Sequence, residues 1–249
     1  MQYTRYTARG FSSGYFPAGV KWLLISNTAV FLVNFLAVRF TGADPFLFLG
    51  LMPWQVAGRG YLWQLVTYLF LHGGLMHILF NMLTLWMFGA DLERDWGTRR
   101  FLRYYFLCGV GAGVCVVAAN LLVGNPYTRT IGSSGAIYGL LMAYGLLYPD
   151  RMVLFSFLFP MKAKYFVMIL GGIAFLGSLE ASGGGVSHLA HLGGMIFGYA
   201  YLKTRLGRRG VRLDLAGSLR RGLREWRMRR ARRKFDTYTR KQDRDRWVH

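Results

Sequence analysis

The residues Gly132-Ser133-Ser134-Gly135 open an apolar run that continues to Tyr148 without a charged side chain. The two glycines around Ser134 permit a tight turn and a close approach of the backbone to another group. A helix over Ser134–Tyr148 would have about 15 residues and a length of roughly 22 Å at 1.5 Å per residue. Set in a bilayer, whose hydrocarbon core is about 30 Å thick, such a helix would start below the outer surface. Ser134 is therefore expected inside the membrane.

The composition of the whole chain is that of an integral membrane protein. Of the 249 residues, 53% are hydrophobic and only 17% are charged, whereas about 25% of the residues of a soluble protein are charged. The mean hydropathy is +0.27. A water-soluble domain of this size could not bury so much apolar surface, so a soluble fold is excluded.

Six apolar segments are predicted to form membrane helices, and the fourth is the short one. They cover approximately residues 20–38, 74–89, 101–123, 134–148, 165–179 and 188–201. The loops assigned to the inner side carry several lysines and arginines, whereas the outer loops carry essentially Arg59 and Arg129. This asymmetry predicts an all-α bundle of six transmembrane helices with both termini in the cytoplasm. The charged residues 91–100 are expected to be an inner loop, and residues 150–164 an inner connection.

The positive charge lies mainly at the C-terminal end. From Lys203 onward the chain carries 18 Lys or Arg against 5 Asp or Glu, which is +13 of the total net charge of +20. Such a tail is compatible with a nucleic-acid partner, but in a membrane protein it is more typical of a juxtamembrane segment on anionic headgroups. No nucleic acid is expected. The predicted divisions are a cytoplasmic segment at 1–18, a six-helix domain at 19–204 and a basic cytoplasmic tail at 205–249.

Histidines, rather than acidic residues, lie in or near the predicted spans. No Asp or Glu falls within a span, whereas His72, His77, His188 and His191 lie in or just before the outer halves of the second and sixth segments. Because ionisable groups are costly in a membrane, they indicate a functional site. The missing carboxylate counts against a proton-coupled transporter.

Helical spacing brings polar side chains together at this depth. His77 and Asn81 are four residues apart, so they lie on one face of the second helix. Tyr138 lies one turn after Ser134, and His191 lies one turn into the sixth helix, at a level near Ser134. A serine needs a base to take its proton, and a histidine within hydrogen-bond reach is the usual one. A Ser134–His191 dyad is expected, with Tyr138 holding the imidazole by ring packing.

An acyl-transfer site also needs donors aimed at the developing oxyanion. His77, Asn81 and the backbone N–H of Ser134 are the candidates. The pair Gly194-x-x-x-Gly198 is typical of close packing between membrane helices. Cys108 and Cys115 lie one heptad apart in an apolar stretch, so they are interpreted as small core residues, and neither a disulfide nor a metal site is predicted.

At these residues the sequence resembles the rhomboid family of intramembrane serine proteases. Residues 72–81 (His-Gly-Gly-Leu-Met-His-Ile-Leu-Phe-Asn), 132–135 (Gly-Ser-Ser-Gly) and 190–194 (Ala-His-Leu-Gly-Gly) match three of its motifs. Residues 89–97 are similar to its Gly-x-x-x-Glu-x-x-x-Gly pattern, whose glutamate, Glu93, is interpreted as structural. The resemblance covers about residues 18–204.

The resemblance implies a six-helix core with Ser134 as nucleophile and His191 as general base and acid. His77, Asn81 and the Ser134 amide would stabilise the oxyanion. The substrates would be single-pass membrane proteins cut within or beside their transmembrane segment, without metal or cofactor, in a bacterial inner membrane. The supporting residues are Gly132, Gly135, Tyr138, Gly194 and Gly198.

One departure and two alternatives accompany this interpretation. The family often has Trp-Arg in its first outer loop, where this chain has Trp63-Gln64, so the contacts between loop and bundle are not predicted. A catalytically silent relative that binds membrane proteins would typically lack Ser134 or His191, and this chain has both. A channel or transporter would need a polar path through the membrane, whereas the polar residues stop at its middle.

Overall fold

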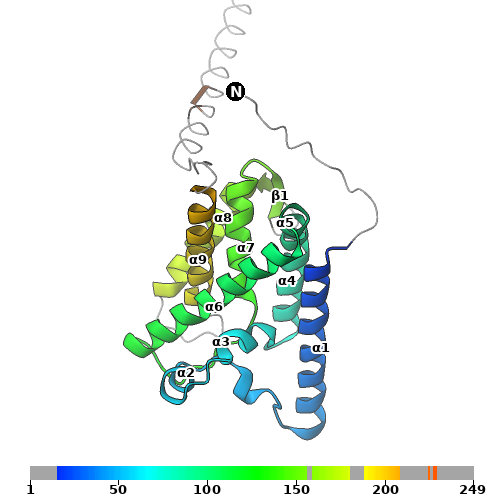
Figure 1. Ribbon diagram of the computed structural model, residues 1–249, viewed down its shortest axis with the longest axis vertical. Coiled ribbons are helices and arrows are strands. Elements are labelled where there is room, and N and C mark those ends of the chain that lie inside the picture. Colours follow the sequence, from blue (N-terminus) through cyan, green and yellow to red (C-terminus); the bar gives the residue numbers. More distant parts are fainter. Residues whose placement is uncertain (1–15, 156–158, 180–187, 208–223, 225–226, 229–249) are drawn as a thin grey trace, which may run out of the picture. The chain divides into compact units, whose positions relative to one another are not determined.

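The structure, a computed structural model, describes residues 16–155, 159–179, 188–207, 224 and 227–228. The chain divides into two units, Met1–Leu202 and Lys203–His249. Within its described part the first unit consists of helices and a single two-stranded sheet (Figure 1).

Three long helices have the length and composition of membrane spans in the part of the chain that the structure describes. The first is α1, Ala18–Thr41. The second runs without interruption from Leu75 to Trp96 and consists of α4 (Leu75–Thr84), a π-helical segment (Leu85–Gly89) and α5 (Ala90–Trp96). The third is α6, Thr98–Leu122.

The three remaining predicted segments are also helical. They are α7 (Ser134–Leu147), α8 (Ala163–Leu179) and α9 (His188–Gly207). Helix α7 has 14 residues, a length of about 21 Å, so it is shorter than a hydrocarbon core. Figure 1 shows α6 crossing in front of α7 and α9, and the α6 side chains Tyr104, Tyr105 and Cys108 are fully buried.

The charged residues 91–100 do not form the loop expected from the sequence. Helix continues to Trp96, and the chain turns only at Gly97, whose φ is +76°. Glu93 explains why this charged segment is helical and buried rather than a loop in water. Its carboxylate accepts hydrogen bonds from the backbone N–H groups of Gly19 and Val20 (2.8 and 2.7 Å) and from the hydroxyl of Thr98 (2.6 Å). The first turn of α1 has no side-chain cap of its own, so Glu93 satisfies amides that helix geometry leaves without a partner. The structural interpretation of Glu93 agrees with these contacts.

The outer connection between α1 and α4 is folded rather than extended. It contains a 3-10 turn (Leu47–Leu49), α2 (Pro53–Arg59), α3 (Gln64–Thr67) and a second 3-10 turn (Tyr68–Phe70). Gln64 is fully buried among these turns.

Gln64 makes the contacts that the sequence left open at Trp63-Gln64. Its Nε2 donates to the Phe48 carbonyl (3.0 Å) and to Gln55 Oε1 (2.6 Å), and its Oε1 accepts from the Met52 amide (3.0 Å). The neighbouring Trp63 indole also donates to Phe48 (3.3 Å). A neutral amide that both donates and accepts thus holds the loop together.

The inner connection between α7 and α8 is a β-hairpin that the sequence did not predict. Strand β1 (Met152–Phe155) pairs antiparallel with β2 (Phe159–Lys162), with Met152 opposite Lys162. The amides of Ala163 and Lys164 donate to the carbonyls of Arg151 and Pro149, which joins the hairpin base to the start of α8. A short apolar run does not distinguish strand from helix by its periodicity.

Candidate active site

Ser134 lies at the first position of α7, where the chain turns into the helix. Gly132 has a φ of +118°, a conformation that side-chain-bearing residues rarely adopt. Its amide donates to the Tyr68 carbonyl (2.9 Å), which fixes the segment leading to the helix. Because α7 begins at Ser134, no earlier helical carbonyl can accept its backbone N–H, and the positive end of the helix dipole lies there.

The structure brings His191 of α9 to Ser134. The distance from His191 Nε2 to Ser134 Oγ is 2.9 Å, within the normal range of a hydrogen bond. His191 is 5% exposed, so little water competes for this contact. The two residues are 57 positions apart in the chain, and their meeting agrees with the depth argument made from the length of the fourth helix.

Tyr138 stacks on the imidazole of His191. The ring centroids are 4.0 Å apart and the ring planes differ by 5°, which restricts rotation of the imidazole. Nδ1 of His191 is buried and has no hydrogen-bond partner among the described residues. Within the described part of the chain, the orientation of the imidazole therefore rests on ring packing and on Ser134.

His77 of α4 faces the same small space as Ser134. A methyl group placed on Gly132 would lie 2.7 Å from His77 Nε2 and 3.9 Å from Ser134 Oγ. The amide of Gly73 donates to His77 Nδ1 across 3.4 Å. An acceptor at Nδ1 places the proton of a neutral imidazole on Nε2, so Nε2 is the donor that points toward this space.

Asn81 lies one turn further along α4 and is 7% exposed. Its Nδ2 donates to the carbonyl of His77 (2.8 Å), so one of its two N–H bonds is used within the helix. The described contacts do not bring Asn81 to Ser134, whereas His191 bonds it directly.

The predicted supporting glycines lie where α7 and α9 meet. A β-carbon at Gly194 would overlap the carbonyl oxygen of Gly135, and one at Gly198 would lie 3.3 Å from Gly139. Gly135 in turn faces Ala112 of α6 and the Ala190 carbonyl. The two helix backbones are in direct contact, which brings the residue before Gly135 close to the helix that carries His191.

Two further residues at the site were not assigned a definite contact from the sequence. Ser133 is fully buried, and its Oγ lies 3.4 Å from His72 Nε2. The His72 ring stands edge-on to that of His77, with centroids 5.0 Å apart. The position of Ser133 inside the Gly-Ser-Ser-Gly motif indicated that it lies at the site. Its partner, His72, could not be predicted because it is 61 residues away.

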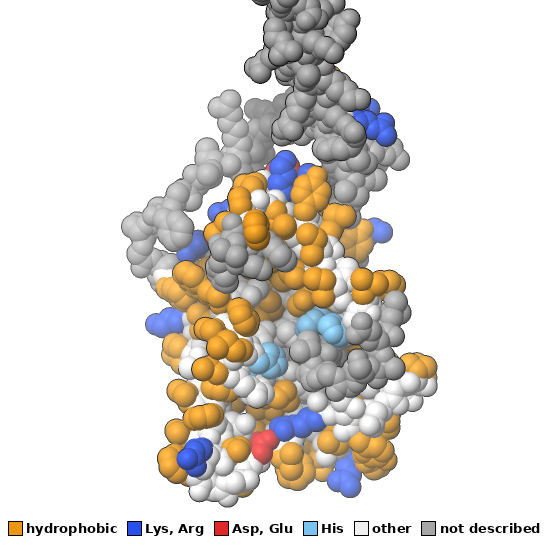
Figure 2. Space-filling model, turned by 180° about the vertical axis from the view of Figure 1, so that it is seen from behind, with side chains coloured by type: hydrophobic (Ala, Val, Ile, Leu, Met, Phe, Trp, Pro, Cys, Tyr) orange, Lys and Arg blue, Asp and Glu red, His pale blue; other side chains and the backbone are white. Residues whose placement is uncertain are grey.

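The surroundings of the site are apolar. Figure 2 shows histidine side chains in the middle of a face on which hydrophobic side chains predominate. No group of three His, Cys, Asp or Glu side chains able to hold a metal ion occurs in the described part of the chain. The arrangement provides a hydroxyl, a base and N–H donors.

A bundle of apolar helices that holds a paired serine and histidine defines a polytopic membrane protein with a hydrolase-like site. The sequence profile described as the Rhomboid domain matches residues 59–208, and the chain belongs to the rhomboid family. The matched region contains Ser134, His191, His77 and Asn81.

Three relatives illustrate the similarity. "Rhomboid-like protease 5" of Toxoplasma gondii is 35% identical over 161 residues, which is 60% of this chain and 17% of that protein. "Rhomboid protease GluP" of Bacillus subtilis (strain 168) is 31% identical over 162 residues, 64% of this chain and 29% of the relative. "Putative rhomboid protease YdcA" of the same bacterium is 31% identical over 144 residues, 57% of this chain and 66% of the relative. The matched region thus spans less than a third of the first two.

Proposed function

We propose that this chain is an intramembrane serine endopeptidase that cuts membrane-anchored proteins within or beside their transmembrane segments. The observation that carries the proposal is the 2.9 Å contact between His191 Nε2 and Ser134 Oγ in an apolar bundle. The relatives' printed names, "Rhomboid-like protease 5", "Rhomboid protease GluP" and "Putative rhomboid protease YdcA", support the same activity.

In the proposed reaction, Ser134 Oγ attacks the carbonyl carbon of the scissile peptide bond. His191 Nε2 takes the hydroxyl proton as the new C–O bond forms and then gives it to the leaving amine nitrogen, which yields an acyl-enzyme. A water molecule, activated by the same nitrogen, hydrolyses the ester and returns the proton to Ser134. The Tyr138 ring keeps the imidazole in the plane that both transfers require.

The oxyanion of the tetrahedral intermediate would be held by three donors. These are the Ser134 amide at the start of α7, the Nε2–H of His77, and the second N–H bond of the Asn81 amide, whose first bond is used by the His77 carbonyl. Removing one such donor typically costs about 10²–10³ in turnover. Because one N–H bond of Asn81 is already used within the helix, its contribution is expected to be smaller than that of His77.

The proposed topology has six membrane helices and both termini in the cytoplasm. The three long helices, the apolar helices α7 and α8, and α9 would each cross or enter the bilayer, with the short α7 bearing Ser134 at its outer end. Single cysteines at 59 and at 99, labelled with a membrane-impermeant reagent in intact cells, test the sidedness. Labelling at 99 instead of 59 would reverse the topology.

The basic residues beyond Lys203 are proposed to rest on anionic headgroups. This part of the proposal depends on charge alone. Trypsin should cut the tail more slowly in vesicles that contain phosphatidylglycerol than in phosphatidylcholine vesicles, and salt should remove the difference. The relatives come from bacteria, plants, yeast and a parasite, so the bacterial inner membrane stays a prediction from the resemblance.

The decisive test is covalent labelling of the purified full chain with a fluorophosphonate, followed by mapping of the modified residue. We expect labelling at Ser134, cleavage of a single-pass reporter, and loss of both in Ser134→Ala and His191→Ala. Ser133→Ala is the matched control, since it removes the adjacent hydroxyl and should still be labelled. A folded chain that neither labels nor cleaves would be a binding protein instead, and solute flux in liposomes that is unaffected by Ser134→Ala would indicate a channel.

A further inference from the structure

The hairpin formed by β1 (Met152–Phe155) and β2 (Phe159–Lys162) exposes apolar side chains. Met152 is 57% exposed, Leu154 49% and Phe159 64%. In the antiparallel register Leu154 stands opposite Pro160 and Met152 opposite Lys162, so these four residues share one face. Val153, which points the other way, is buried. Met152, Leu154 and Pro160 thus form an exposed apolar face, whereas Phe159, which stands opposite Phe155, lies on the side of Val153.

The base of the hairpin is polar and fixed to the bundle. Arg151 forms an ion pair with Asp91 of α5 (2.9 Å), and Lys162 and Lys164 both contact Asp150 (3.0 Å each). Hydrogen bonds from Lys162 and Lys164 lower the pKa of Asp150 below its ordinary value, so it is ionised at neutral pH. The hairpin therefore cannot move far from the end of α5 and α7 without breaking these pairs.

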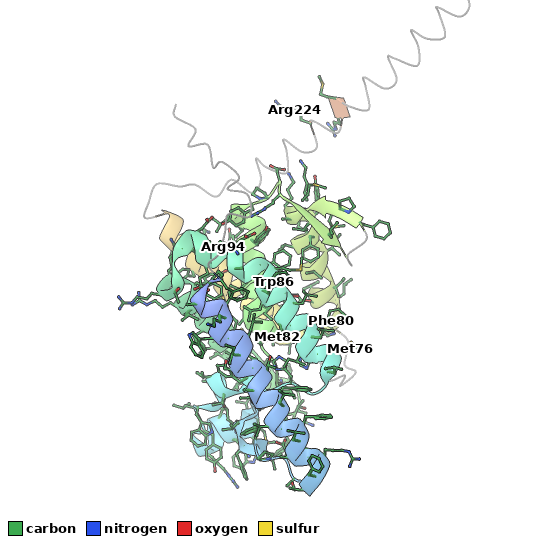
Figure 3. All side chains as sticks on the ribbon, turned by 90° about the vertical axis from the view of Figure 1, so that its right-hand side faces the viewer. Met76, Phe80, Met82, Trp86, Arg94 and Arg224 are labelled. Carbon is green, nitrogen blue, oxygen red and sulfur yellow. The ribbon has the colours of Figure 1, made fainter. Side chains whose placement is uncertain are left out.

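The position of the hairpin along the membrane helices follows from the same contacts. It follows α7, whose other end bears Ser134, so about 21 Å of helix separates it from the candidate active site. Figure 3 shows the two strands at the same end of the bundle as Arg94, with Met76 toward the other end of α4. Figure 1 also places β1 beside α5. The apolar face thus lies where the membrane helices end.

The sheet geometry restricts how deep this face can lie. A two-stranded sheet has two open edges, whose unpaired N–H and C=O groups are not tolerated in hydrocarbon. In water, a hairpin with exposed Met, Leu and Phe would be marginally stable. The boundary between headgroups and acyl chains satisfies both demands, because water and phosphates reach the edges while the side chains enter the hydrocarbon.

The charge around the hairpin selects the kind of lipid. Between residues 150 and 164 there are three cations, Arg151, Lys162 and Lys164, against the single acid Asp150. Arg99 and Arg100 begin α6 at the same end of the bundle. Positively charged residues at the base of the hairpin, next to its apolar face, fit a leaflet with negatively charged headgroups.

We propose that the β1–β2 hairpin is an interfacial lipid-binding element, which inserts Met152 and Leu154 into the leaflet at the α5 end and holds anionic phospholipid headgroups with the basic residues at its base. The element lies at the opposite end of α7 from Ser134. Its role is independent of the proteolytic activity proposed above.

The test measures the depth of single fluorescent labels in the reconstituted full chain. Cysteines replace Met152, Leu154 or Asp150 one at a time in a chain with Cys108→Ala and Cys115→Ala, and each carries a bimane label. We expect lipids brominated near the headgroup to quench the labels at 152 and 154 several-fold more than the label at 150. Aqueous iodide should quench in the reverse order. The contrast should be larger with phosphatidylglycerol than with phosphatidylcholine alone, and smaller at high salt.

Three results would overturn the proposal. Equal iodide quenching at 150, 152 and 154 would place the apolar face in water. Protection from both quenchers that disappears on dilution into excess lipid would indicate a second copy of the chain as the partner. Photoactivatable phosphatidylglycerol added to the unmodified chain provides a measurement without cysteine variants, and absence of crosslinks to residues 151–164 would also reject the idea.

Discussion

Gly194 of α9 packs directly on the carbonyl oxygen of Gly135 of α7, so that the place where a β-carbon would stand at residue 194 is already occupied. This contact lies one turn from His191 on α9 and next to Ser134 on α7. The spacing of the two helix backbones at this point therefore fixes the distance between the proposed nucleophile and its base.

Gly194→Ala is expected to push α9 away from α7. Overpacking of a tight contact costs about 1–3 kcal/mol, and the shift should separate His191 from Ser134 and lower the rate of fluorophosphonate labelling more than tenfold. Gly172→Ala on α8 is the matched control, since nothing lies within 4 Å of its added methyl group. That control should label normally and unfold at the same or a higher temperature, because alanine favours helix. Equal labelling of the two variants would contradict the packing argument.

The ring of Tyr138, rather than its hydroxyl, is expected to matter. Tyr138→Phe keeps a ring 4.0 Å from the imidazole in nearly parallel planes, so labelling of Ser134 should change little. Tyr138→Leu removes the stack, which is worth about 0.5–1.5 kcal/mol, and should slow labelling by about tenfold. Helical circular dichroism and thermal unfolding distinguish this effect from misfolding. If Tyr138→Phe were as slow as Tyr138→Leu, the hydroxyl would be the important group.

The sequence predicted the site better than the segments around it. The length of α7 and the periodicities of α4 and α9 brought Ser134, His77 and His191 to similar depths, because helix geometry converts residue number into height. The approach of His77 to Gly132 depends on the backbone φ of Gly132, which is +118°. The spacing of residues in the sequence cannot predict such an angle. Asn81, predicted as an oxyanion donor on the same helix face as His77, donates one N–H to the His77 carbonyl of its own helix, a local hydrogen bond that the spacing does not reveal.

Charged and short segments were predicted less well for a common reason. The sequence predicts a loop over residues 91–100 because charged residues usually face water, but the partners of Glu93 are amides 73 and 74 positions away. The hairpin depends on a register between two strands of four residues each. Both features are decided by long-range contacts.

Glu93→Gln is expected to destabilise the start of α1. One of the two oxygens that accept hydrogen bonds becomes an NH₂ group facing a buried donor, which costs about 1–3 kcal/mol or more for a charged partner. Asp150→Asn is the matched control, because Asp150 is 64% exposed in its ion pairs and such pairs contribute about 0–1 kcal/mol. The pKa of Asp150 is lowered in the folded state. Its ion pairs therefore add their small contribution to folding stability at pH values above the pKa of the unfolded state, and they lose it as the pH falls through the pKa of the folded state. Similar unfolding temperatures for the two variants would contradict the capping role of Glu93.

Gln64→Met is expected to loosen the outer loop while preserving side-chain volume. The substitution leaves the Met52 amide without its acceptor, whereas the Phe48 carbonyl loses one donor and keeps the Trp63 indole. An unpaired buried group costs about 1–3 kcal/mol. Gln55→Met is the matched control because it removes a single bond, the one to Gln64 Nε2. Gln64→Met should therefore unfold at a lower temperature than Gln55→Met and be cut faster by protease between residues 42 and 63.

The same substitution should reach the candidate active site. Leu51 lies beside Met52 and pairs with Thr130 through two backbone hydrogen bonds (2.9 and 2.8 Å), and Thr130 is two residues before Gly132. Loosening at Met52 weakens this isolated β-bridge, which lies just before the turn to Ser134, so fluorophosphonate labelling of Gln64→Met should be slower than that of Gln55→Met. Faster proteolysis with unchanged labelling would mean that Gln64 stabilises the outer loop but does not affect the position of Ser134.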